Sequence, residues 1–280
     1  MKKENPTGAG KGCGFGCGSL SIIAVLFLVG SYFFIDSKIN ALGEIEDGFD
    51  QLKDKYGEIE SFVPYTDGVI PADRIEKFIQ LRESISEERS KLERSLINLS
   101  EELKTLEDGE SLFEMAFVIK ELISAIPDIV DYVAVRNEKL LEMDLGLGEY
   151  YYIYVSGFYA MLNKPPGSGT DAIIIHRNEN SISIGLTDED KIPKYSGDEA
   201  IALRNQRITD ESNRFLQRIF SNLNKVKSTD GNTVEKEELF DSENVLIDNK
   251  YFLNLEPFRD RLEKSFSSIV NPIEVIFIAQ

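Results

Sequence analysis

The stretch that decides the fold is residues 71–107, which read PADRIEKFIQLRESISEERSKLERSLINLSEELKTLE. Its apolar residues recur at the spacing of one helix face, and Pro71 suits the first turn of a helix. The pattern therefore predicts one long helix from Pro71 to Glu107. The residues of its apolar stripe are Ile75, Phe78, Ile85, Leu92, Leu96, Leu99, Leu103 and Leu106.

Two arginines, Arg82 and Arg89, stand at positions of this stripe where an apolar residue is expected. An arginine can lay its aliphatic stem along an apolar seam while its guanidinium stays in water. We therefore expect Arg82 and Arg89 to be semi-buried seam residues with hydrated head groups.

A second apolar seam precedes the long helix. Its residues follow one another in heptad-like steps of three and four, which indicates an amphipathic helix. Pro64 and the turn signal Asp67-Gly68 separate it from residue 71, so the two helices are predicted to form an antiparallel pair. The seam consists of Ile39, Leu42, Ile45, Phe49, Leu52, Tyr56 and Ile59.

Residues 19–35 read SLSIIAVLFLVGSYFFI, and the uncharged run extends back to Gly12. A helix that crosses a bilayer needs about 20 such residues. Residues 14–35 are therefore predicted to be a transmembrane anchor in the lipid bilayer, and the helix with the seam from Ile39 to Ile59 a stalk leaving it. A cleavable signal peptide is the alternative, since Val29-Gly30-Ser31 resembles a cleavage site, but the apolar run continues to Ile35.

The three lysines before the anchor place the N-terminus in the cytoplasm. Residues 1–13 then form a cytoplasmic arm whose alternating glycines make either a flexible tether or, if helical, a face for close helix packing. The chain carries 31 Lys+Arg against 49 Asp+Glu, a net charge of −18. Such acidity excludes nucleic-acid binding, which needs a basic surface.

Residues 112–143 are also helical in pattern, with Pro127 either kinking one helix or starting the next. After a Gly-rich break, residues 149–162 read EYYYIYVSGFYAML. One interpretation is a central helix whose tyrosine hydroxyls bind carboxylates or backbone. The other is an aromatic groove for a ligand or a partner, lined by Tyr150, Tyr151, Tyr154 and Tyr159.

A linker, KPPGSG, begins at Lys164. Apolar runs at 172–175 and 181–184 predict a small β-hairpin, which either docks on the helices or stays partly disordered. Helices are then expected at 198–226 and from 256 to about 271, where Pro272 ends the last. The fold class is thus mostly α: an anchor, an acidic helical bundle with long antiparallel helices (36–163), a linker with a hairpin insertion (164–198), and C-terminal helices that pack on the bundle (199–280).

Catalytic motifs are missing from the sequence. His176 is the single histidine, both cysteines lie in the first 17 residues, and no Gly-x-Ser-x-Gly motif occurs. With 49 acids, neighbouring carboxylates carry no specificity. We therefore expect no enzyme activity, no metal and no cofactor.

Residues 62–84, FVPYTDGVIPADRIEKFIQLRES, resemble a segment of uncharacterised bacterial single-pass membrane proteins, as do residues 149–154 and 255–259 with Asn271-Pro272. The resemblance implies a bacterial origin and a single-pass topology, and no activity. The matching positions of the first segment are Phe62, Pro64, Asp67, Gly68, Phe78 and Arg82.

The sequence therefore predicts an inner-membrane protein whose main domain lies outside the cytoplasm. We expect it to act by protein–protein contact, with another envelope protein or with itself. A ligand-binding or sensory domain with a tyrosine-lined pocket is the alternative.

Overall fold

The computed structural model describes part of the chain. Residues 1–44 lie outside the described residues, so the arm (1–13) and the anchor (14–35) stay predictions. Within the described part, no helix is both long enough and apolar enough to cross a bilayer. The described residues are 45–65, 69–106, 112–166, 174–178, 181–185, 197–229 and 253–275.

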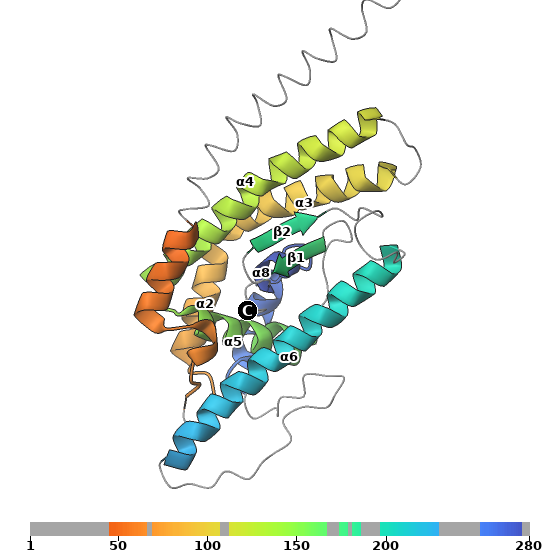
Figure 1. The fold of residues 1–280 in the computed structure, drawn as a ribbon. Coiled ribbons are helices and arrows are strands. Elements are labelled where there is room, and N and C mark those ends of the chain that lie inside the picture. Colours follow the sequence, from red (N-terminus) through yellow and green to blue (C-terminus); the bar gives the residue numbers. More distant parts are fainter. Residues whose placement is uncertain are drawn as a thin grey trace, which may run out of the picture. The chain divides into compact units, whose positions relative to one another are not determined.

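The described residues are mostly helical, which confirms the predicted class (Figure 1). A helix over residues 45–56 comes first. The later elements are η1 (Ile59–Ser61), α2 (Ala72–Ser84), α3 (Ser86–Leu106), α4 (Leu112–Glu142), α5 (Leu147–Tyr154), the π-helix η2 (Val155–Met161), β1 (Ile174–Asn178), β2 (Ser181–Gly185), α6 (Gly197–Thr229), η4 (Glu256–Phe258), α7 (Arg259–Ser265) and α8 (Asn271–Val275).

The two short strands pair antiparallel, with Ile174 opposite Gly185. The residues that join and flank these strands lie outside the described part, as do the strands' side chains. The predicted hairpin insertion and its docking therefore stay predictions.

The prediction of one helix over residues 71–107 is wrong, because the chain leaves helical geometry at Ile85 (φ −99°, ψ 17°). The Ser84 hydroxyl donates to the Leu81 carbonyl at 2.8 Å, a local bond that competes with helix continuation. Glu87 and Glu88 then suit the first turn of a new helix. As a result α2 and α3 point in different directions (Figure 1).

The long antiparallel pair is α3 with α4, which run side by side (Figure 1). The predicted partner of the long helix, the stalk, instead contacts the end of α4: Tyr56 donates to Asp144 Oδ1 at 2.8 Å. Pro127 lies inside α4, so the alternative in which it starts a new helix is wrong.

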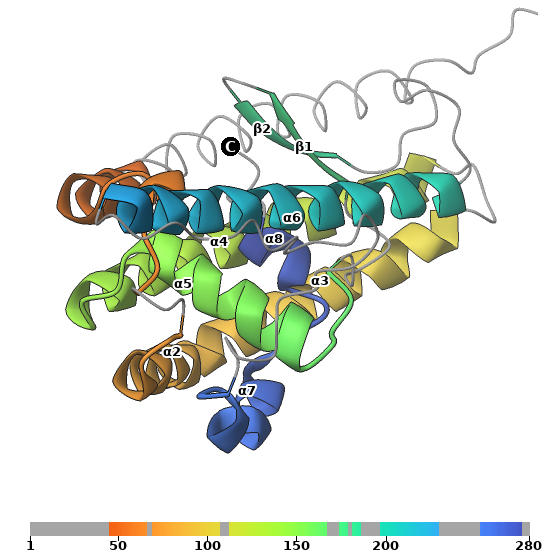
Figure 2. The ribbon, with the colours of Figure 1, turned by 90° about the horizontal axis from the view of Figure 1, so that it is seen from below.

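The central helix is α5 with its continuation η2, and it is buried from Leu147 to Tyr159. Figure 2 shows α6 on one side of it and α2 and α7 on the other. A Cβ on Gly148 would lie 2.5 Å from both the Ile59 carbonyl oxygen and the Phe62 Cβ. Only glycine therefore lets η1 approach α5 so closely.

The prediction that Pro272 ends the last helix is also wrong. The chain leaves α7 at Phe266 (ψ 139°), and Pro272 lies in the first turn of a separate helix, α8. Proline suits a first turn because its missing N–H has no helical partner there. All five residues of α8 are buried, which carries their polar side chains into the core.

Candidate functional site

A cluster of charged and hydroxyl side chains lies in the core where α2, α4, α5 and α8 meet. Glu274 of α8 forms an ion pair with Arg82 of α2, and its Oε2 lies 3.5 Å from Nη1 of Arg136 of α4. The side chains of all three are at most 1% exposed. We call Arg82, Tyr132, Arg136 and Tyr150, the groups around this carboxylate, the carboxylate cage.

Hydroxyl groups complete the cage. Tyr132 donates to Oε1 of Glu274, and Tyr150 donates to Oε2 at 3.0 Å. Arg82 donates from Nη1 to the Tyr150 hydroxyl at 2.9 Å, and from Nη2 to the Ser265 carbonyl at 2.7 Å. Within the described part of the chain, Nε of Arg82 is buried without a hydrogen-bond partner.

Aromatic rings surround both guanidinium groups. The Arg82 Cζ lies 5.5 Å from the ring centre of Tyr154 and 5.6 Å from that of Phe158. The Arg136 Cζ lies 5.8 Å from the ring centre of Tyr150 and 5.9 Å from that of Phe49. Such ring faces attract cations, and they also exclude water from the cage.

The electrostatics keep the cage charged at neutral pH. Burial by itself would raise the pKa of Glu274, but the charges of Arg82 and Arg136 outweigh it and hold that pKa below its ordinary value of 4.5. Burial would lower the pKa of Arg82, yet Glu274 and the tyrosines raise it well above its ordinary value. Burial raises the pKa of Tyr132 and of Tyr150, so both hydroxyls stay protonated donors.

A second polar residue of α8, Asn271, extends the network. The hydroxyls of Tyr154 and Tyr159 donate to its Oδ1 at 2.9 and 2.7 Å, and its Nδ2 donates to the Pro166 carbonyl at 2.7 Å. Asn271 and Glu274 are three positions apart and hence share one helix face. This face binds α8 to the central helix.

The prediction of hydrated head groups for Arg82 and Arg89 is wrong. Arg82 is fully buried, and Arg89 is 8% exposed, with its Nη1 donating to the Arg82 carbonyl at 3.1 Å. Burial, followed by repulsion from Arg82, lowers the pKa of Arg89. The stripe tolerates a buried Arg82 because Glu274 supplies its counter-charge from a segment 192 positions away.

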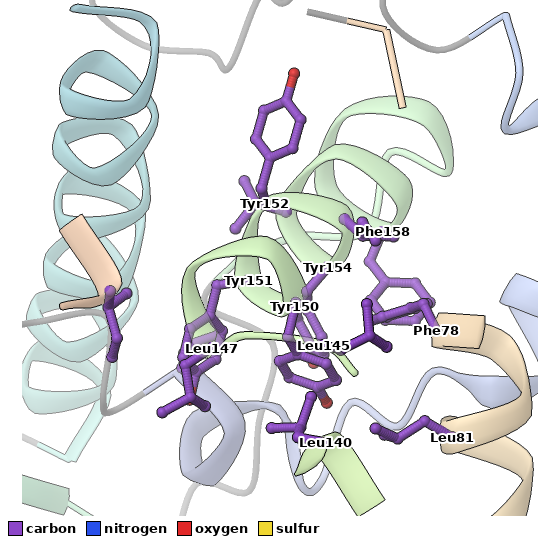
Figure 3. Packing of buried hydrophobic residues seen from close by; sticks show 14 of the residues in the cluster. Phe78, Leu81, Leu140, Leu145, Leu147, Tyr150, Tyr151, Tyr152, Tyr154 and Phe158 are labelled. Carbon is purple, nitrogen blue, oxygen red and sulfur yellow. The ribbon is translucent and has the colours of Figure 1, made fainter. Parts of the chain in front are cut away.

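The structure brings the four predicted groove tyrosines together, but in the core. Tyr150, Tyr151 and Tyr154 are fully buried, and Tyr159 is 4% exposed. Figure 3 shows Tyr150 and Tyr154 on one side of the helix and Tyr152 on the opposite side. The hydroxyls of Tyr150, Tyr154 and Tyr159 bind Glu274 or Asn271, so the arrangement matches the interpretation as a central helix.

Sequence reasoning missed Arg136, Asn271 and Glu274. Asn271 and Glu274 belong to the mostly apolar stretch NPIEVIFI, whereas Arg136 ends the apolar run YVAV and is followed by the polar residues NEK. The isolated charge of Glu274 was the available signal, because a buried charge requires a partner.

A smaller group, the rim pair Arg74 and Glu149, lies at the start of α5. Arg74 donates from Nε to Glu149 Oε1 at 2.6 Å and from Nη2 to the Asp144 carbonyl at 2.7 Å. The Tyr65 hydroxyl donates to the same carboxylate at 3.0 Å. Burial and the charge of Glu149 raise the pKa of Tyr65 to about 12. These contacts fasten α2 to the start of the central helix.

Among the residues described, no three His, Cys, Asp or Glu side chains lie close enough together to hold a metal ion. His176 lies on β1, and its side chain is outside the described part. No family model matches the chain, and no match is found among curated proteins or among solved structures.

Proposed function

We propose that this chain is a membrane-anchored, acidic helical domain that acts by contact with another envelope protein and not by catalysis. The observation that carries this proposal is the position of the exposed apolar side chains. Of the six large ones among the described residues, four lie on segments that are tied to one another. We call these four, Val63, Tyr65, Val226 and Leu253, the apolar corner.

Two asparagines tie the segments of the apolar corner. Asn222 of α6 donates from Nδ2 to the carbonyls of Glu60 and Phe62 at 2.7 and 3.2 Å. Val226 follows one helical turn later on the same face of α6. Asn254, next to Leu253, donates to the Ile70 carbonyl at 3.1 Å. Exposed apolar side chains on segments linked in this way are the kind of surface that a protein–protein contact would bury.

The partner's chemistry follows from the charge. The arm holds three Lys and one Glu, which is +2 of the total of −18, so the remainder of the chain carries −20. A partner that offers an apolar surface bordered by Lys and Arg would be steered toward this domain and would match it. The uncharged residues 14–35 hold the domain at the outer face of the cytoplasmic membrane, where such a partner would meet it.

The test is photocrosslinking in cells that express the full-length chain, with benzoylphenylalanine at Val63 or at Val226. The matched control is Leu203, which lies on the same helix as Val226 and is as exposed (45% against 42%). We expect one defined crosslinked protein from Val63 and Val226 and none from Leu203. Equal labelling at all three positions, or a full-length chain recovered from the aqueous fraction with residues 1–35 intact, would contradict the proposal.

The second candidate is a ligand-binding domain, and the specific observation in its favour is the carboxylate cage. Two guanidinium groups and two hydroxyls converge on one carboxylate, as in proteins that bind organic acids. Thermal-shift measurements with metabolites would favour this candidate if a stabilising compound lost its effect in Tyr150→Phe.

A further inference from the structure

The two arginines of the carboxylate cage also have contacts that do not involve Glu274. Arg82 is fixed by the Tyr150 hydroxyl and the Ser265 carbonyl. Arg136 donates from Nη2 to Asn137 Oδ1 at 3.0 Å and from Nη1 to the Tyr151 hydroxyl at 3.3 Å. A site whose donors are positioned by their surroundings binds its ligand with little loss of side-chain entropy.

Two guanidinium groups of the cage face one carboxylate. Arg82 and Arg136 contribute two positive charges, and Glu274 contributes one negative charge. Arg89, also buried, donates to the backbone of Arg82 and adds a third positive charge nearby. Buried guanidinium groups favour an anionic ligand, and their forked geometry suits the two oxygens of a carboxylate.

The carboxylate arrives on a separate element. The four cage residues belong to α2, α4 and α5, whereas Glu274 is on the five-residue helix α8. Residues 266–270 separate α8 from α7, and Phe266 has extended geometry. Glu274 thus resembles a ligand that is tethered to its binding site by the chain.

We propose that the carboxylate cage is a binding site for a small aliphatic monocarboxylate, and that Glu274 occupies it as an internal ligand. The ligand class follows from the side chain that occupies the site: a carboxylate beside Arg82 and Arg136, on a short aliphatic stem. In the wild-type chain the site is closed, and a free carboxylate enters only when the Glu274 side chain is absent or α8 is withdrawn.

The experiment removes the internal ligand and supplies it from solution. Glu274→Ala deletes the CH₂–COO⁻ portion of the side chain, which acetate replaces in shape and charge. The melting temperature of the full-length variant in detergent is measured in sodium acetate, in sodium chloride of equal ionic strength, and in the same chloride with acetamide. We expect acetate alone to raise it, on the order of 5 °C, and the increase to grow with the logarithm of acetate concentration.

Three matched proteins complete the test. The wild type and Glu274→Gln, in which a side chain fills the site, are expected to melt at the same temperature in acetate and chloride. Arg82→Met combined with Glu274→Ala is expected to lose the response to acetate. An equal effect of acetate and acetamide on Glu274→Ala, or an undiminished response in the double variant, overturns the proposal.

Glu274→Ala is also informative if it does not fold in chloride. The same titration is then followed by far-ultraviolet circular dichroism, and we expect acetate, but not acetamide, to restore the helical signal. A variant that stays unfolded at all acetate concentrations overturns the proposal as well. Neither outcome depends on the crosslinking at the apolar corner, so failure of this inference is distinguishable from failure of the proposed function.

Discussion

Two arginine–carboxylate contacts join α2 to the C-terminal helices, one in the core and one at the surface. In the core, Glu274 of α8 binds Arg82 of α2. At the surface, Arg261 of α7 binds Glu76 and Glu83 of α2, at 2.7 and 2.9 Å. The surface arginine has the better geometry, with four hydrogen bonds to two carboxylates, but its side chain is 38% exposed, whereas that of Arg82 is fully buried.

This difference in burial shows that hydrogen-bond geometry alone does not determine how much such a contact contributes to stability. In water, an arginine that loses its partner is rehydrated, so the exposed contact contributes little. In the core, water cannot replace a lost partner, and the remaining charge is left without compensation. The buried contact is therefore the one on which the fold depends, although it adds little net stability itself.

The largest effect is expected from Glu274→Gln, which preserves the shape of the side chain and removes its charge. The buried guanidinium group of Arg82 then lacks the carboxylate that pairs with it, and the free energy of unfolding should fall by about 3–5 kcal/mol. Urea unfolding measures this change. Arg82→Met should lower the free energy of unfolding much less in Glu274→Gln than in the wild type, because the two residues are coupled. A loss below about 1 kcal/mol would contradict the contrast between core and surface.

A smaller effect is expected from Asn271→Leu, which removes polar contacts of the core without changing its charge. The hydroxyls of Tyr154 and Tyr159 would lose their acceptor and the Pro166 carbonyl its donor, so we expect a loss of about 2–3 kcal/mol in urea unfolding. Tyr159→Phe is the matched control: it deletes one hydroxyl and leaves the others bound, so its cost should be about 1 kcal/mol.

Arg261→Ala tests the surface side of the comparison. We expect a loss of about 0.2–1 kcal/mol in the same unfolding measurement, and a loss that shrinks as salt is added. Arg261→Lys keeps the charge but not the forked geometry, so its free energy of unfolding should lie between those of Arg261→Ala and the wild type. A loss as large as that of Glu274→Gln would mean that burial is not what separates the two contacts.

The smallest expected signal is a difference in pH dependence. Because the pKa of Glu274 is lower in the folded protein than its ordinary value of 4.5, its contribution is fully present above pH 4.5. It is lost as the pH falls through the lower, folded value. Free energies of unfolding measured between pH 6 and pH 3 should therefore decline less steeply for Glu274→Gln than for the wild type. Parallel curves would show that the pKa of this carboxylate does not change on folding, which would contradict the lowered value.

Local patterns predicted the elements better than their connections. The helix expected at 198–226 is α6 (Gly197–Thr229), and the tyrosine-rich segment is the central helix. Both follow from the spacing of nearby residues. The break at Ile85 did not follow, because an apolar stripe can continue across a bend. The role of Pro272 was also misjudged, since a proline can either follow one helix or open the next.

Part of the candidate site could be predicted from the sequence. Arg82 and the tyrosines stood out by their positions, and the interpretation in which tyrosine hydroxyls bind carboxylates agrees with the contact between Tyr150 and Glu274. The identity of that carboxylate could not be predicted. No periodic pattern relates position 82 to position 274, and only the three-dimensional arrangement selects Glu274 among 49 acids.

The distance in sequence between Arg82 and Glu274 has a consequence for biosynthesis. A ribosome adds about 5–20 residues per second, so the 192 positions between them correspond to roughly 10–40 s of translation. During this interval the nascent chain has its cationic groups but not the acid that neutralises them. The core should therefore stay incompletely packed and accessible to chaperones until α8 has been made.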